Sequence, residues 1–179
     1  DNIHINITVD AVAGTGVFGQ SSTSLVSTSY ANMRTLLLAD SKTADDATAL
    51  GVGGSVTSAD PIGTAHSWWV SRAEAKAIGL IADDFSNDGT TTFGAGNPFT
   101  FSGSIAGGTY DFQGVAAHEI SEVMGRLGLC DSNLGPGNPH SYSLADNFSY
   151  TGPGAKSPGK GPGQNFSINN GTTLLKPFN

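Results

Sequence analysis

At 179 residues, the chain is long enough for one domain with a substantial core and short for two. Its formal net charge is −7 and its eight Lys and Arg residues form no cluster, which argues against a nucleic-acid partner because a phosphate-binding groove needs such a cluster. No apolar run approaches the roughly 20 residues that span a bilayer, and a charged fraction of only 13%, with abundant Ser, Thr, Asn and Gly, favours a secreted, extracellular protein.

The amino-terminal part carries three local patterns. Residues 3–12 alternate apolar and polar side chains, which predicts a strand with one buried face. Residues 30–39 have helical spacing, and Ser29 is a suitable N-cap. A second, short helix is expected over residues 44–50, stopped by the glycines that begin at Gly51.

The next segments alternate between strand and helix patterns. Residues 67–70 predict a strand, and Ser71 and Glu74 have the spacing of a capping box that opens a helix ending near Gly79. Gly, Pro, Ser and Asn dominate the carboxyl-terminal segment 132–179, which is expected to be rich in loops and short strands. These patterns predict an α+β fold.

Residues 110–126 predict a helix with two distinct faces. At about 100° per residue, His118 and Glu122 project together from one side, with Glu119 beside them. A different side is expected to pack into a core through an apolar stripe formed by Ala116, Ile120, Val123 and Leu127.

The polar side of this helix suits a zinc site. One turn separates His118 and Glu122, so both can reach one ion, and Glu119 can serve as general base towards a water molecule. The usual signature is His-Glu-x-x-His, and carboxylate is a less common zinc ligand than histidine at the second position. Spacing alone also fits a solvated polar helix face.

Four segments follow one another in a characteristic order: 44–47, 75–80, 110–126 and 165–171. Together they resemble the bacterial secreted metalloproteases typified by an HEISEVMGR helix, here residues 118–126. The resemblance implies an exported, zinc-dependent peptidase that acts on a protein or peptide substrate. It also implies a single zincin-like domain over residues 1–179, with a small mixed sheet and a few helices including the metal-site helix.

Two features depart from that family. Its members continue past the equivalent of residues 177–179 with an acidic and aromatic segment, so this chain is expected to be processed, truncated or specialised. Where they read roughly Leu-Asp-Leu-Phe-Arg-Tyr, residues 144–150 retain the Asp and the Tyr but lack the Arg.

A catalytic zinc usually has three protein ligands. Asp146 is the first candidate for the third, and nearby Tyr150 could donate to the oxyanion. His140 is the second candidate and Asp131 the third, since both lie in loops that could return to the helix. Of the two remaining histidines, His4 is expected on the surface and His66 is expected to be packed.

Calcium and manganese are alternatives to zinc. Residues 84–89 match the first part of an EF-hand loop, but Ala95 stands where a bidentate Glu is needed, so a polar turn is favoured and calcium stays a minor alternative. A carboxylate-rich site would also accept manganese. Cys130 is the only cysteine, which excludes an internal disulfide and a thiolate cage.

Two other functions compete with peptide hydrolysis. The chain could be an extracellular filament or surface-layer subunit that self-assembles on an inactive metallopeptidase scaffold, as its low charge and its Ser, Thr, Asn and Gly content suggest. It could also be a binding module with a structural metal and a closed coordination shell. N-glycosylation sequons begin at Asn6, Asn147, Asn165 and Asn170.

Overall fold

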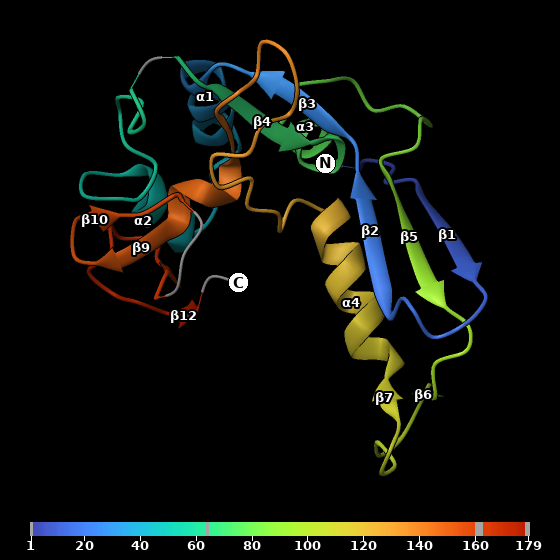
Figure 1. Cartoon of the computed structure of the whole chain (residues 1–179). Coiled ribbons are helices and arrows are strands. Elements are labelled where there is room, and N and C mark those ends of the chain that lie inside the picture. Colours follow the sequence, from blue (N-terminus) through green and yellow to red (C-terminus); the bar gives the residue numbers. More distant parts are fainter. Residues whose placement is uncertain (1, 64, 160–162, 178–179) are drawn as a thin grey trace. The chain divides into compact units, whose positions relative to one another are not determined.

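The computed structural model describes residues 2–63, 65–159 and 163–177. It contains helices and several small sheets, which confirms the α+β prediction (Figure 1). Contacts group the chain into two compact units whose segments alternate along the sequence. None of the helices in the described ranges is long and apolar enough to cross a membrane. Unit 1 comprises Asp1–Leu25, Ser71–Ala77 and Ile81–Arg126, and unit 2 comprises Val26–Val70, Ile78–Leu80 and Leu127–Asn179.

Unit 1 contains a three-stranded sheet in the order β1-β5-β2, formed by β1 (Ile7–Val12), β5 (Gly89–Gly94) and β2 (Gly19–Thr23). Strand β1 runs parallel to β5, whereas β2 runs antiparallel to it. Helix α4 (Phe112–Val123) packs on β2 and β5. The sequence predicted that one face of the first strand would be buried, and this prediction is wrong. Strand β1 lies at the edge of the sheet, and all its residues after Ile7 are exposed.

Only part of the predicted apolar stripe of α4 is buried. Val123 is fully buried, but Ile120 is exposed, and Leu127 lies beyond the end of the helix. The buried face includes Glu119, which is only 7% exposed. A glycine allows the close approach, because a Cβ added to Gly89 would lie 2.6 Å from Cγ1 of Val123.

The predicted capping box opens helix α3 (Arg72–Ala77). The backbone N–H of Ser71 donates to Oε2 of Glu74, and the N–H of Glu74 donates to Oγ of Ser71, both at 3.0 Å. The helix ends at Ala77, and Gly79 in the following turn has a φ of +73°, which favours glycine.

Cationic side chains of α3 bind the loop of residues 84–89, whose sequence partly matches a calcium-binding loop. Nζ of Lys76 donates to Oδ2 of Asp88 at 2.9 Å, and both side chains are fully buried. Arg72 donates to both carboxylate oxygens of Asp84, at 2.7 and 2.9 Å, which holds the pKa of Asp84 at about 2. Lys76 also donates to the carbonyl of His4 at 3.0 Å. The loop is thus a polar turn whose carboxylates are paired with Lys and Arg.

Unit 2 contains the two helices expected in the amino-terminal part. Helix α1 (Tyr30–Asp40) begins at Ser29, whose hydroxyl accepts the N–H of Asn32 at 3.1 Å. Helix α2 (Ala44–Leu50) is stopped by Gly51, as predicted, and it begins with a capping box formed by Thr43 and Asp46.

Two small sheets complete unit 2. The first has the order β3-β4-β8 and contains the predicted strand at residues 67–70, now bounded as β4. Its members are β3 (Leu25–Thr28), β4 (Ser67–Ser71) and β8 (Ser141–Ser143). The second has the order β10-β9-β11-β12 and follows the 3-10 helix η1 (Leu144–Phe148). Its members are β9 (Ser149–Gly152), β10 (Ala155–Lys156), β11 (Asn165–Phe166) and β12 (Lys176–Pro177).

Candidate functional site

Both ends of α4 are fixed by local structure. The Asp111 side chain caps the start of the helix by accepting the N–H of Gln113 at 3.0 Å. Gly125 turns the chain after the helix with φ +114°, and a Cβ there would collide with the Glu74 side chain. These two constraints set the start and exit of the helix that carries His118 and Glu122.

The structure brings His118 and Glu122 together. Nε2 of His118 lies 3.2 Å from Oε1 of Glu122, and the imidazole is exposed. Zn–N and Zn–O bonds of about 2.0–2.2 Å at the tetrahedral angle place two ligand atoms about 3.4 Å apart. The pair therefore fits two adjacent positions of a tetrahedral zinc site. The same separation allows a hydrogen bond between the two side chains.

Two residues outside the predicted site contact this pair. Ser21, on β2, donates a hydrogen bond to Oε2 of Glu122. Nη2 of Arg126 lies 3.0 Å from Nδ1 of His118, and Nε of Arg126 donates to Ser121 at 2.7 Å. Because guanidinium only donates, Nδ1 accepts, and the neutral imidazole carries its proton on Nε2 towards Glu122.

This tautomer is the reverse of the one that a metal at Nε2 requires. A histidine that binds a metal through Nε2 normally donates its Nδ1–H to an acceptor. Arg126 offers a donor at that atom instead. Metal binding at His118 would therefore require the Arg126 guanidinium to turn away from the ring.

The side chain of Glu119 is on the buried side of α4, which packs on β2, and Glu119 directly follows His118 in the sequence. Burial raises the pKa of its carboxyl, and the negative charge of Glu122 adds to the rise. Among the described residues, none donates a hydrogen bond to the Glu119 carboxylate, which leaves its oxygens available as proton acceptors. This is the electrostatic setting of a general base.

Asp146, the first candidate for a third ligand, has a different role in unit 2. It is fully buried, and Oδ2 accepts the N–H of Ser143 at 2.7 Å at the start of η1. Oδ2 also accepts the N–H groups of Leu129 and Cys130, each at 3.1 Å. The carboxylate thus closes a capping box and fixes the preceding turn, so we leave Asp146 out of the proposed mechanism. The Ser-x-x-Asp spacing at residues 143–146 already carried this signal.

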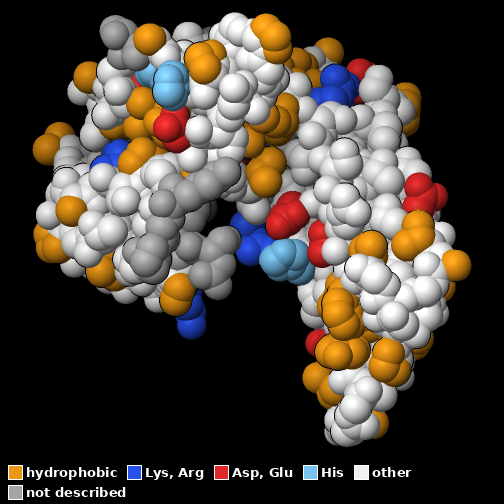
Figure 2. Space-filling model, viewed as in Figure 1, with side chains coloured by type: hydrophobic (Ala, Val, Ile, Leu, Met, Phe, Trp, Pro, Cys, Tyr) orange, Lys and Arg blue, Asp and Glu red, His pale blue; other side chains and the backbone are white. Residues whose placement is uncertain are grey.

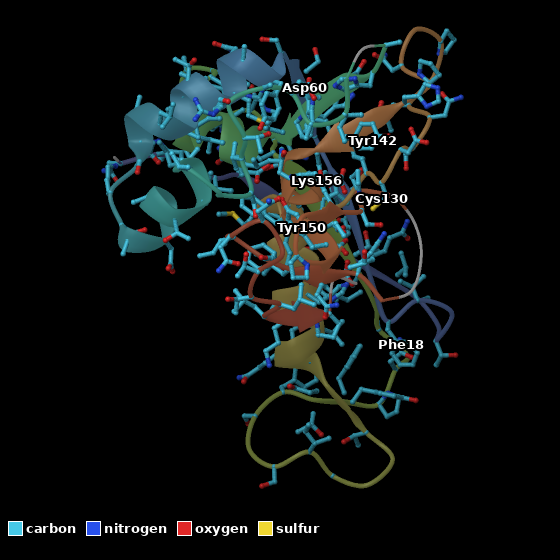
Figure 3. The ribbon with its side chains drawn as sticks, turned by 90° about the vertical axis from the view of Figure 1, so that its left-hand side faces the viewer. Phe18, Asp60, Cys130, Tyr142, Tyr150 and Lys156 are labelled. Atoms are coloured by element: carbon cyan, nitrogen blue, oxygen red, sulfur yellow. The ribbon has the colours of Figure 1, made fainter. Side chains whose placement is uncertain are left out.

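Tyr150 is also part of the interior of unit 2. Its side chain is fully buried, and Nζ of Lys156 lies 5.0 Å from the centroid of its ring (Figure 3). An oxyanion donor must reach the substrate, and a fully buried phenol does not. The expected catalytic role of Tyr150 is therefore not supported by its position.

The remaining candidates form His–carboxylate pairs. Nδ1 of His140 lies 2.8 Å from Oδ1 of Asp131, so the second and third candidates contact each other. His66 is buried with Nε2 at 3.0 Å from Asp60, as expected of a packed histidine. The exposed ring of His4 pairs with a carboxylate too, that of Asp83 at 2.7 Å.

Within the described ranges, no group of three or more His, Cys, Asp or Glu side chains is placed so as to hold a metal ion. The third ligand stays a prediction. Comparison of the chain with models of protein families, with curated proteins and with solved structures finds no match. The resemblance to the HEISEVMGR metalloproteases therefore stays an expectation from the sequence.

Proposed function

We propose that this chain is a secreted, metal-dependent peptide hydrolase whose site is on α4. The observation that carries the proposal is the 3.2 Å separation of His118 Nε2 and Glu122 Oε1 on an exposed side of the helix. Ser21 orients the Glu122 carboxylate from β2, as outer partners of metal ligands commonly do. The adjacent Glu119 supplies a carboxylate with a raised pKa.

The residues divide the chemistry between them. His118 and Glu122 would hold zinc, and a bound zinc ion would polarise the scissile carbonyl and lower the pKa of a water molecule. Glu119 would take the proton from that water and pass it to the leaving amine. Its position against β2 keeps the carboxylate partly dehydrated, which brings its pKa closer to neutral pH and improves it as a base.

The first test is metal content measured by mass spectrometry on the purified protein. Near-stoichiometric zinc in the wild type should disappear in His118→Ala/Glu122→Ala. A matched control is His4→Ala/Asp83→Ala, which removes another His–carboxylate pair of unit 1. Folded wild-type protein that takes up no metal when zinc is supplied would sink the proposal.

The second test separates chemistry from metal binding. Glu119→Gln should retain zinc and lose hydrolysis of a quenched fluorescent peptide by about 100-fold or more, since general bases typically contribute 10²–10⁴-fold. Full activity in this variant would rule out Glu119 as the base.

A structural, self-assembling subunit is the second candidate, and one observation favours it. Strand β1 is at the edge of its sheet, pairs with β5 on one side, and leaves Val9 65% exposed. Unprotected edge strands pair readily with strands of other chains. Assembly seen by light scattering should survive Glu119→Gln and be lost in Val9→Lys. Monomeric wild-type protein at high concentration would exclude this candidate.

A further inference from the structure

Arg126 is an exposed residue whose guanidinium contacts the candidate site directly. Its Nη2 lies 3.0 Å from Nδ1 of His118, and its Nε donates to Oγ of Ser121 at 2.7 Å. Burial raises the pKa of the Glu119 carboxyl, and the positive charge of Arg126 is among the influences that oppose this rise. The guanidinium is therefore within electrostatic range of the proposed base. In the space-filling view, basic, histidine and acidic side chains meet at one place on the surface (Figure 2).

Local structure at both ends of α4 holds Arg126 in place. The helix starts directly after β7 (Tyr110–Asp111), which pairs with β6 (Phe99–Thr100) (Figure 1). Beyond the helix, Gly125 turns the chain, and the backbone N–H of Arg126 donates to the carbonyl of Ser121 at 2.8 Å. The hydroxyl of the same serine orients the guanidinium. A side chain that is positioned before a ligand arrives loses less conformational entropy on binding.

The charge of Arg126 is not paired with a carboxylate. Unit 1 contains two other basic side chains, Arg72 and Lys76, and both form ion pairs with Asp84 and Asp88. Among the described residues, no Asp or Glu forms an ion pair with Arg126. An exposed guanidinium of this kind, next to a site for chemistry, is suited to binding an anionic group of a substrate.

The N–H groups of Arg126 that are left over suit a carboxylate. Nε is used on Ser121 and one N–H of Nη2 is used on His118, whereas the outer N–H groups of Nη1 and Nη2 have no partner in the described part of the chain. These outer groups lie in one plane and match the two oxygens of a carboxylate. A phosphate would bring about two negative charges towards Glu119 and Glu122, and a single cation would not offset them. A carboxylate brings only one.

A carboxylate on this guanidinium would lie close to a peptide bond at the site. The guanidinium contacts the His118 ring itself. In a peptide, the carboxylate carbon of the last residue is only about 3–4 Å from the carbonyl carbon of the residue before it. An Asp side chain places its carboxylate at a similar distance from the peptide bond that precedes it. The anchored carboxylate therefore belongs to the residue that follows the scissile bond.

We propose that Arg126 binds a carboxylate of the peptide substrate, on the residue that follows the bond to be cleaved. This carboxylate is the free carboxyl terminus of the substrate or an Asp side chain, and the guanidinium recognises both through the same hydrogen bonds. The inference rests on the proposed function, because it assigns the substrate class of that site.

The first test measures peptide binding to the metal-free full chain, so that a changed zinc affinity of a variant does not enter. Calorimetric titrations use acetyl-Ala-Ala-Ala with a free carboxylate, the same peptide as its carboxyl amide, and the amide of acetyl-Ala-Asp-Ala. The wild type should bind at least one of the two acids about tenfold more tightly than the neutral amide, as hydrogen bonds between charged groups allow. Arg126→Gln should abolish this difference. The control Lys42→Gln removes an exposed cation of unit 2 and should retain it.

The outcomes separate the two sources of the carboxylate and separate this inference from the proposed function. Tighter binding of the free acid assigns the carboxyl terminus, and tighter binding of the Asp peptide assigns the side chain. A preference that depends on Arg126 supports the inference even if the wild type hydrolyses no peptide and the proposed function fails. Equal affinity for all three peptides, or a preference that persists in a folded Arg126→Gln protein, overturns it.

The second test makes the same comparison on hydrolysis by the zinc-loaded chain. Matched quenched fluorescent peptides carry the acid that binds more tightly or its neutral amide next to the cleavage site. The ratio of their kcat/KM values should be about ten or more in the wild type and should fall close to unity in Arg126→Gln. The ratio is measured because a change in zinc binding affects both substrates equally. An unchanged ratio in Arg126→Gln overturns the inference.

Discussion

The backbone of Gly19 and the side chain of Glu119 occupy adjoining space between β2 and α4. A Cβ at residue 19 would lie 2.5 Å from Oε1 and 2.8 Å from Cγ of Glu119, closer than real Cβ contacts come. Glycine at this position therefore allows the proposed base to lie against the strand. Any side chain at residue 19 would therefore displace the Glu119 carboxylate or the strand.

Replacing Gly19 by Ala should push Glu119 away from β2. We expect a loss of about 1–3 kcal/mol in the free energy of unfolding, as overpacking usually costs, and at least a tenfold loss of peptide hydrolysis with zinc retained. Chemical denaturation, metal analysis and the peptide assay measure the three effects. Gly16→Ala is the control, since nothing lies within 4 Å of its Cβ position. Equal behaviour of the two variants would contradict the close packing.

The buried pair of Lys76 and Asp88 should be essential to the stability of unit 1. Burial alone would lower the pKa of Lys76, but the hydrogen bonds and charges of Asp88 and Asp84 outweigh it and raise the pKa. Lys76→Met leaves Asp88 buried beside one fewer cation, so unfolding should become easier by about 3–5 kcal/mol.

Thermal and urea denaturation measure this loss. Lys42→Met, which breaks the exposed pair with Asp40, is the control and should change little. Replacing both partners, in Lys76→Met/Asp88→Leu, should recover part of the loss because no charge is then left unpaired. A double variant as unstable as Lys76→Met would show that the cost does not come from the orphaned carboxylate.

Glu74 should make stability depend on pH. Burial raises the pKa of its carboxyl from 4.5 to about 7, against the opposing hydrogen bonds from Ser71. Between these two values the folded chain keeps a proton that the unfolded chain has released, so stability falls as pH rises through this window. The contribution is fully present below pH 4.5, is lost above about pH 7, and amounts to at most about 3 kcal/mol.

The measurement is the unfolding free energy of wild type and Glu74→Gln at a series of pH values. The amide cannot titrate but can still accept the N–H of Ser71. The difference between the two proteins should therefore change across the window and be flat outside it. A constant difference from pH 4 to pH 8 would show that Glu74 titrates normally.

Arg126 should weaken metal binding at His118. Its guanidinium donates towards Nδ1, which favours the tautomer with the proton on Nε2, where the metal would bind. Arg126→Gln should therefore tighten zinc binding by about tenfold, within the range found for outer partners of metal ligands. Competition with a chelator of known affinity measures the change. Arg126→Lys keeps the positive charge and should have a smaller effect, whereas weaker binding in Arg126→Gln would contradict the argument.

Asp146 should stabilise the fold of unit 2 and should not affect zinc binding. Asp146→Ala removes the acceptor for the N–H groups of Leu129, Cys130 and Ser143, and each such group left buried without a partner costs about 1–3 kcal/mol. We expect a loss of several kcal/mol in unfolding free energy, with zinc content per folded molecule unchanged. Zinc lost from a folded Asp146→Asn protein would instead restore this residue as a ligand.

The parts of the fold that follow local rules were predictable. Ser29 and the Ser71–Glu74 capping box mark helix starts through hydrogen bonds that span three residues, so the sequence contains the whole interaction. The edge position of β1 was not predictable, because alternation shows that a strand has two different faces but not whether anything covers them. That outcome depends on pairing between residues such as Ile7 and Gly89, far apart in the chain.

In the candidate site, too, the local contacts were predictable and the long-range contacts were not. The approach of His118 and Glu122 follows from helix geometry and is visible in the sequence. The contact of Ser21 with Glu122 spans 101 positions and leaves no local trace. The Ser143-x-x-Asp146 spacing is a local signal for the helix cap that Asp146 forms, but an aspartate downstream of the helix fits a metal ligand equally well from the sequence.

The alternating segments of the two units have a consequence for how the chain is made. Unit 1 needs residues from Asp1–Leu25 through to Ile81–Arg126, and unit 2 needs Leu127–Asn179. Neither unit is one continuous segment of the chain, so neither can be produced as one continuous fragment. A truncation cannot remove one unit completely without removing strands or helices of the other unit as well. During synthesis, β1 emerges long before its partner β5, so its apolar edge waits unpaired while more than seventy further residues are added. Pairing between strands so far apart in the chain forms slowly, and it leaves strand edges exposed while the chain folds.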